Sequence, residues 1–210
     1  GYLYPGATYP YGMVQFTPSY FSKRSGFVIN QLSGGGCEHM GNFPTFPVKG
    51  KLKMSPDNIL NYRINISEEK GHAGYYEAKV QEDIHAKLTV TERTGMASYE
   101  YPADQQYGTV IIGGGISATP IEQAAIVITA PNKCEGYAEG GNFCGLRTPY
   151  KVYFVAEFDT DALESGTWKR DELKPNTTFA EGEYSGVYFT FDVNKKKNIQ
   201  YKIGVSYVPV

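Results

Sequence analysis

The chain has 210 residues and a mass of 23.3 kDa, which is the size of one large domain or at most two small ones. Its 20 Lys and Arg residues nearly balance its 22 Asp and Glu residues, giving a net charge of −2. This balance argues against a nucleic-acid-binding protein and a polybasic membrane anchor, because both need a basic excess. No apolar run approaches the roughly 18 residues of a membrane-spanning helix.

The composition favours β-structure. There are 18 Tyr, 11 Phe, 24 Gly and 12 Pro residues, against a single Trp. Aromatic rings pack well on pleated surfaces, and Gly and Pro end strands and form turns.

Alternation of apolar and polar residues predicts strands along the whole chain. Its clearest case is a hairpin, with strands at Tyr76–Val80 and Ile84–Val90 and a turn near Glu82–Asp83. Other strands are expected at 12–17, 62–66, 95–101, 107–112, 123–129, 152–158, 187–193 and 199–205. The segment Val152–Phe158 is apolar on both faces, which predicts cover on both sides.

The lysine-rich segment Asn194–Asn198 lies between two apolar stripes and is expected to be a solvated hairpin tip. About a dozen strands are too many for one flat sheet. We therefore predict an all-β fold, a large antiparallel β-sandwich of two sheets, forming a single domain over residues 1–210.

The most informative segment that does not fit a strand is Gln31–Pro44. Three consecutive glycines, Gly34, Gly35 and Gly36, let the backbone approach a ligand or another segment closely. They are followed by Cys37, Glu38 and His39, whose side chains can bond, ligate or exchange protons. The alternative interpretation is a tight turn with ordinary surface polar residues.

A second glycine-rich segment contains Cys134 and Cys144. Ten residues apart, they are a candidate disulfide across a hairpin, which would fit an oxidising compartment and leave Cys37 unpaired. Two buried free thiols are an equally good interpretation. Three cysteines without Cys-x-x-Cys or His-x-x-x-His spacing do not indicate zinc, so no metal ligand is assigned.

No complete catalytic set is evident. A glycosidase needs two carboxylates roughly 5 to 10 Å apart, whereas Glu38 is the only acid in a loop that looks built for a ligand. No catalytic residue is therefore assigned. From the residues alone, the chain is a secreted-type, aromatic-rich β-sandwich, and carbohydrate is the natural ligand because sugar rings stack on aromatic faces.

Several motifs, in order along almost the whole chain, resemble glycoside hydrolase family 92, the α-mannosidases. The resembling segments are Pro5–Thr8, Pro10–Gln15, Leu32–Cys37, Gly41–Pro44, Gly74–Tyr76, Thr91–Gly95 with Tyr99 and Pro102, Gly140–Gly145, Val152–Phe158 and Lys202–Val208. The last of these resembles the junction at which the family's first domain ends.

The resemblance implies an N-terminal supersandwich of the galactose-mutarotase-like type, followed by a C-terminal (α/α)6 domain. It implies a secreted, periplasmic or cell-surface bacterial exo-α-mannosidase that inverts the anomeric centre of mannose-containing glycans. Ca²⁺, the general acid and the general base would belong to the C-terminal partner domain, so the 210-residue piece alone is expected to be inactive, with no cofactor of its own.

The resemblance also implies that the glycine-rich loop forms part of the leaving-group subsite. We expect Gly34–Gly36 to approach the sugar, Gln31, Ser33, Glu38 and His39 to bind it, and Cys37 to line the wall. Many family members carry His where this chain has Ile29 and Gln31, and Pro-Asp in place of Glu38-His39. The linkage therefore stays open between α-1,2, another mannosidic linkage and a mannosyl-phosphate. Two alternatives are a carbohydrate-binding or surface module without an enzymatic partner, and a domain that only buttresses the barrel.

Overall fold

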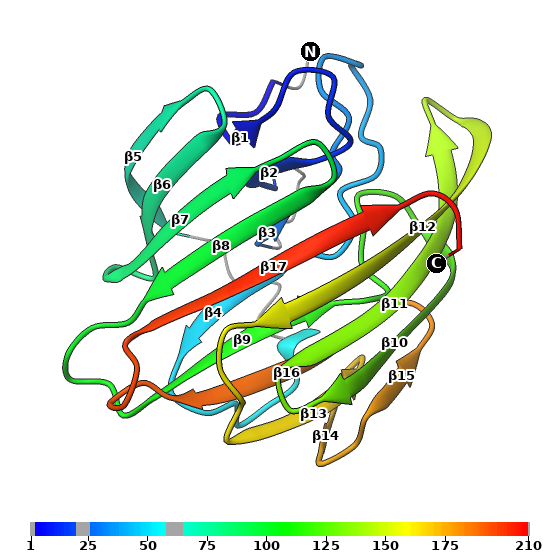
Figure 1. The fold of residues 1–210 in the computed structure, drawn as a ribbon. Coiled ribbons are helices and arrows are strands. Elements are labelled where there is room, and N and C mark those ends of the chain that lie inside the picture. The colour runs from blue at the N-terminus through cyan, green and yellow to red at the C-terminus, as the bar shows by residue number, and fades with distance from the viewer. Residues whose placement is uncertain (1–2, 20–25, 58–64, 210) are drawn as a thin grey trace.

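The computed structural model describes residues 3–19, 26–57 and 65–209, and it places two antiparallel sheets face to face (Figure 1). One sheet has the order β1 (Ala7–Thr8), β2 (Gln15–Pro18), β3 (Phe27–Val28), β4 (Thr45–Lys49), β9 (Tyr107–Gly113), β16 (Ser185–Asp192), β13 (Glu164–Lys169) and β14 (Glu172–Pro175). The all-β sandwich is therefore confirmed.

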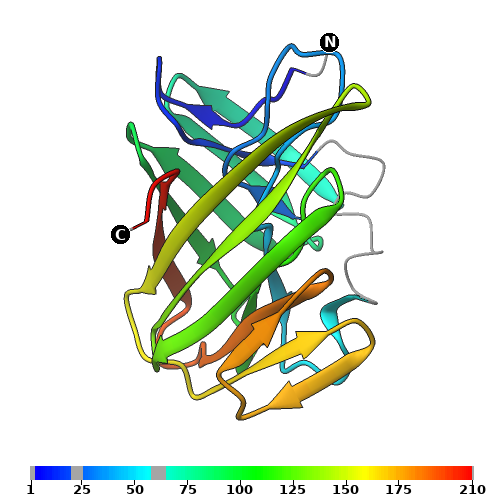
Figure 2. The same ribbon diagram turned by 90° about the vertical axis from the view of Figure 1, so that its right-hand side faces the viewer.

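The second sheet has nine strands among the described residues, and its long strands between residues 121 and 158, coloured green to yellow, run diagonally across Figure 2. Its order is β15 (Phe179–Glu181), β10 (Ile121–Ala130), β11 (Lys133–Phe143), β12 (Leu146–Phe158), β17 (Asn198–Ser206), β8 (Thr94–Glu100), β7 (Ile84–Val90), β6 (Tyr75–Val80) and β5 (Ile66–His72). Within the same residues, no helix is long and apolar enough to cross a membrane.

The predicted hairpin is confirmed as β6 and β7. Its alternating residues are buried on one face, and Val80 pairs with Ile84 across the turn. Of the strand expected at 62–66, residues 62–64 lie outside the described residues, and β5 begins at Ile66.

Two sequence expectations were wrong. Strand β12 is buried only on its inner face, because Tyr153 and Val155 on the other face are only half-buried. The segment Asn194–Asn198 is largely solvent-exposed, but it crosses from β16 in one sheet to β17 in the other. Apolar stripes that flank a polar turn look the same in sequence whether the chain reverses within a sheet or changes sheet.

A cluster of three hydroxyl groups joins the two sheets inside the core. Thr45 comes from β4, whereas Tyr99 and Tyr201 come from β8 and β17 of the opposite sheet, and all three are buried. The Tyr201 hydroxyl donates to Thr45 Oγ1 at 2.5 Å, and the Tyr99 hydroxyl lies 3.1 Å from the same oxygen. Burial raises the pKa of Tyr99 to about 12, so both phenols stay neutral donors at physiological pH.

We predict that Thr45→Val lowers the free energy of unfolding by about 1–3 kcal/mol, because it leaves two buried tyrosine hydroxyls without their shared partner. Urea unfolding followed by circular dichroism measures this. The matched control is Thr129→Val on β10, where the threonine is exposed and its hydroxyl bonds no described residue, and we expect a change within about 0.5 kcal/mol. Equal effects of the two variants would show that the cluster does not stabilise the sandwich.

Candidate functional site

The glycine-rich segment is a closed loop that leaves one end of the sandwich. Gln31 and Met40 form a β-bridge at its base, and the Leu32 N–H donates to the His39 carbonyl at 3.4 Å. The rim of the loop, Ser33–Gly36, is exposed. The loop is therefore fixed at its base and presents its glycines to solvent.

A disulfide ties this loop to the tip of the long β11–β12 hairpin. Cys37 is bonded to Cys144, 107 residues away in sequence, with a Cα–Cα distance of 5.5 Å. The candidate Cys134–Cys144 disulfide is therefore wrong, and Cys134 is a buried free thiol. The reason is geometric: β11 is a continuous strand over Lys133–Phe143, which rises roughly 3.3 Å per residue and keeps those two cysteines about 30 Å apart.

The tip of the hairpin is a tight two-residue turn. Cys144 and Gly145 both have positive φ, at 52° and 82°, as a type I′ turn requires. This turn places Cys144 opposite the loop and leaves Phe143 on the side that packs against it. A Cβ at Gly35 would lie 2.9 Å from Leu32 and 3.3 Å from the Phe143 ring, so the middle glycine permits this close packing.

Gly34 and Gly36 have a different reason for being glycine. Both have a φ of 78°, which side chains rarely tolerate, and a Cβ on either would meet nothing within 4 Å. The loop turn needs them, which agrees with the turn interpretation. They also leave open space at the rim, and close approach of a sugar there stays a prediction.

His39 lies beneath the rim. Its ring is 8% exposed and lies 5.4 Å from the rings of both Phe143 and Tyr150, measured between centroids. Its Nδ1 is 3.4 Å from the Asn142 carbonyl oxygen. His39 therefore supports the contact between the loop and the hairpin, and its predicted sugar contact stays a prediction.

A polar network under the loop joins four segments. The Asn30 and Asn42 side chains are linked at 3.0 Å, and the Asn42 N–H donates to Asn30 Oδ1 at 2.8 Å. Tyr150 donates to Asn42 Oδ1 at 3.0 Å, and Asn30 Nδ2 donates to the Tyr207 hydroxyl at 3.4 Å. Burial raises the pKa of both Tyr150 and Tyr207.

Sequence reasoning missed Asn30, Tyr150 and Tyr207. Asn42 and Tyr207 lie within two of the resembling segments, Gly41–Pro44 and Lys202–Val208, and that is the one signal the sequence offers. Asn30 and Tyr150 lie outside those segments, and only the tertiary fold brings the four side chains together.

Gln31 and Glu38 are the polar side chains of the predicted set that lack partners. Gln31 is 2% exposed, yet neither its amide oxygen nor its amide nitrogen has a hydrogen-bond partner among the described residues. Each unsatisfied buried group costs about 1–3 kcal/mol. The half-buried Glu38 carboxylate forms no ion pair or hydrogen bond with any described residue. The loop base therefore has hydrogen-bonding capacity that this part of the chain does not use.

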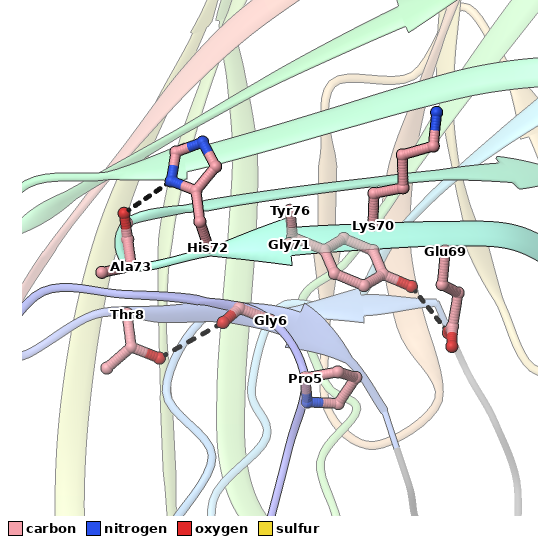
Figure 3. A pocket seen from close by; sticks show the side chains of 10 residues that line it. Pro5, Gly6, Thr8, Glu69, Lys70, Gly71, His72, Ala73 and Tyr76 are labelled. Atoms are coloured by element: carbon pink, nitrogen blue, oxygen red, sulfur yellow. Dashed lines mark hydrogen bonds between the residues drawn. The ribbon is translucent and has the colours of Figure 1, made fainter.

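Away from the loop, a hollow of about 420 Å³ lies between the N-terminal segment and the β5–β6 hairpin (Figure 3). Two of the motifs met in sequence analysis, Pro5–Thr8 and Gly74–Tyr76, line it. Its polar groups are bonded among themselves: Tyr76 donates to Glu69 at 2.8 Å, and His72 Nδ1 lies 3.1 Å from the Ala73 carbonyl. A Cβ at Gly6 would lie 2.2 Å from Thr17, so this motif glycine serves packing.

No group of three or more His, Cys, Asp or Glu side chains in the described segments could hold a metal ion.

The fold and the loop define a β-sandwich domain that carries a tethered, glycine-rich site at one end. The chain matches the family described as "Glycosyl hydrolase family 92 N-terminal domain" over residues 1–206, and it belongs to that family.

Similar proteins share this fold. An α-mannosidase of family GH92 from Bacteroides thetaiotaomicron, in complex with mannoimidazole, has a TM-score of 0.84 at 22% identity over 99% of this chain and 31% of that chain. A GH92 inverting mannosidase from the same organism has a TM-score of 0.76 at 21% identity, over 100% of this chain and 29% of that chain. An uncharacterized secreted glycosidase of Arthroderma benhamiae is 32% identical over 49% of this chain and 16% of its own length. The chain thus spans under a third of the relatives it matches.

We predict that the oxidised chain, unfolded without reductant, shows one titratable thiol, Cys134, because Cys37 and Cys144 are bonded. Peptide mapping should link Cys37 to Cys144. The double variant Cys37→Ser/Cys144→Ser should have a free energy of unfolding about 2–4 kcal/mol lower, because the disulfide closes a long loop.

The control is Cys134→Ala, which should leave the oxidised, unfolded chain with no titratable thiol. A mapped Cys134–Cys144 peptide, or three free thiols, would contradict the tether.

Proposed function

We propose that this chain is the N-terminal domain of an exo-acting α-mannosidase that hydrolyses mannose-containing glycans with inversion. In this proposal the glycine-rich loop forms part of the leaving-group subsite. Membership of the family and the description of its relatives as mannosidases support the activity.

One observation carries the role of the loop. Its rim is exposed and anchored by Cys37–Cys144, while the half-buried Glu38 carboxylate and the buried Gln31 amide at the loop base are without partners among the described residues. Sugars bind through many hydroxyl hydrogen bonds, and a fixed set of unused donors and acceptors provides them without an ordering cost.

The catalytic groups are proposed to belong to a C-terminal (α/α)6 domain of the same polypeptide. Inversion requires a carboxylic acid on one side of the sugar and a carboxylate that activates water on the other. The same domain would hold Ca²⁺, which supplies positive charge beside the reacting sugar when bound. The secreted description of the fungal relative supports a location outside the cytoplasm, and we propose a bacterial periplasm or cell surface.

The first prediction is that the 210-residue chain alone does not hydrolyse an aryl α-mannoside in the presence of calcium. The assay is release of the coloured aryl alcohol, and the control is the longer protein read from the gene downstream of Val210. Turnover by the short chain would place catalytic groups within it. A stop codon directly after Val210 would favour the alternative, a binding or surface module without an enzymatic partner.

The second prediction concerns Glu38 in the longer enzyme. Glu38→Gln should lower kcat/KM for a mannobiose substrate by roughly tenfold to a hundredfold, because a hydrogen bond to a charged group contributes about 1.5–3 kcal/mol. The matched control is Glu100→Gln at the exposed end of β8, which should leave kcat/KM unchanged. Unchanged kinetics for Glu38→Gln would favour the interpretation of this domain as a structural buttress.

A further inference from the structure

The outer face of the nine-stranded sheet carries a groove at its centre, across β8, β17 and β12, which lie side by side in Figure 1. Two hollows form it, of about 530 Å³ and about 230 Å³. They share Val155 and Gly204 in their linings, so they adjoin at that point. The groove lies on a sheet face, whereas the glycine-rich loop lies at the end of the sandwich.

Gly204 makes the groove deep at its middle. It lies in the interior of the central strand β17, where its register partners are Val155 on one side and Thr94 on the other. All three lie on the same face, and the absent side chain leaves a notch between two filled positions. Glycine inside a strand weakens it, and often marks the close approach of a ligand or another backbone.

Nothing in the fold requires glycine at this position. The φ of Gly204 is outside the left-handed region, and a Cβ there would lie 3.8 Å from Thr94 Oγ1 and 4.0 Å from the Arg93 carbonyl oxygen, which are ordinary contacts. The contrast is Gly186, where a Cβ would lie 2.3 Å from the Trp168 ring. Packing explains Gly186 and does not explain Gly204.

The walls of the groove combine an apolar floor with a polar rim. Tyr153, Val155 and Met96 are half-buried and form the floor. Glu157 and Lys202 lie directly opposite each other on β12 and β17, yet they form no ion pair, and neither bonds another described residue. Their charged groups therefore remain available at the rim.

The charges at the rim identify the chemistry of the ligand. Arg93 and Lys202 lie with Glu157 and Asp159 around the groove, and Asp159 forms an ion pair with Lys196 at 2.8 Å. The rim therefore mixes positive and negative groups and does not single out an anion as the ligand. An aromatic and apolar floor beneath mixed donors and acceptors matches a pyranose, which has a C–H face and equatorial hydroxyls.

We propose that this groove binds a neutral oligosaccharide, at a site separate from the glycine-rich loop. From Tyr153 to Glu157 the strand rises about 13 Å at about 3.3 Å per residue, which is longer than one pyranose ring. The choice of a mannose-containing probe rests on the proposed function. The site itself does not, because binding in the groove needs no hydrolysis.

Titration calorimetry of the 210-residue chain with an α-linked mannotetraose tests this proposal. Gly204→Val fills the notch and should weaken the affinity at least tenfold, while its melting temperature stays equal or rises, since a β-branched residue suits a strand. The matched control is Ala125→Val on β10, which places the same side chain on the outer face two strands away from β12 and outside both hollows, and should bind as the unmodified chain does.

Three outcomes would overturn the proposal. They are no heat of binding from the unmodified chain, equal affinity of the Gly204→Val variant, and a melting temperature lowered by that variant, which would make Gly204 structural. If Gly204→Val instead impairs only the stability of the longer protein, the groove is covered by polypeptide and is not a glycan site. If the longer protein does not hydrolyse α-mannosides but the 210-residue chain still binds the mannotetraose, the proposed function is refuted and the groove proposal stands.

Discussion

The structure depends on the contact between two sheets whose inner faces are filled largely by aromatic and branched apolar side chains. Phe158 of β12 lies 4.9 to 5.2 Å from the rings of Phe189, Phe191 and Tyr201; the first two belong to β16 of the opposite sheet and the third to the neighbouring strand β17. Rings at such spacings add packing energy beyond the area they bury. The tyrosine hydroxyls in this layer must then be satisfied inside it, and Thr45 provides the shared oxygen that does so.

The covalent link between Cys37 and Cys144 fixes the glycine-rich loop, the candidate site, to that sandwich. A loop without secondary structure is normally the most mobile part of a domain. Here its base is paired, its middle packs on Phe143, and its far side is bonded to a hairpin that extends from the core strands β11 and β12. The sheet therefore fixes the position of the loop, and a fixed loop can hold Gln31 and Glu38 in one arrangement.

Sequence patterns identified the fold and the loop but not their connections, and the reasons are physical. The alternation in Tyr76–Val80 and Ile84–Val90 reports which face is buried, so that hairpin was predicted correctly. The same kind of pattern does not report which sheet a strand joins, so the crossing at Asn194–Asn198 was taken for a hairpin. Ten residues between two cysteines suggested proximity, because nothing local shows that the intervening segment is one extended strand.

Glycine is the residue type for which the role predicted from the sequence differs most from the role seen in the structure. In sequence, the run Gly34–Gly36 stands out as the functional signal, whereas Gly204 is a single glycine within the segment Lys202–Val208. In the structure, all three loop glycines have a conformational or packing reason, whereas Gly204 has neither. A glycine that the fold explains is weak evidence for a ligand, and a glycine in a central strand that the fold does not explain is stronger evidence. The groove on the sheet face is proposed on the same criterion that reassigns the loop glycines to structure. Gln31 and Glu38, whose side chains have no partner among the described residues, remain the reason to propose the loop as a site.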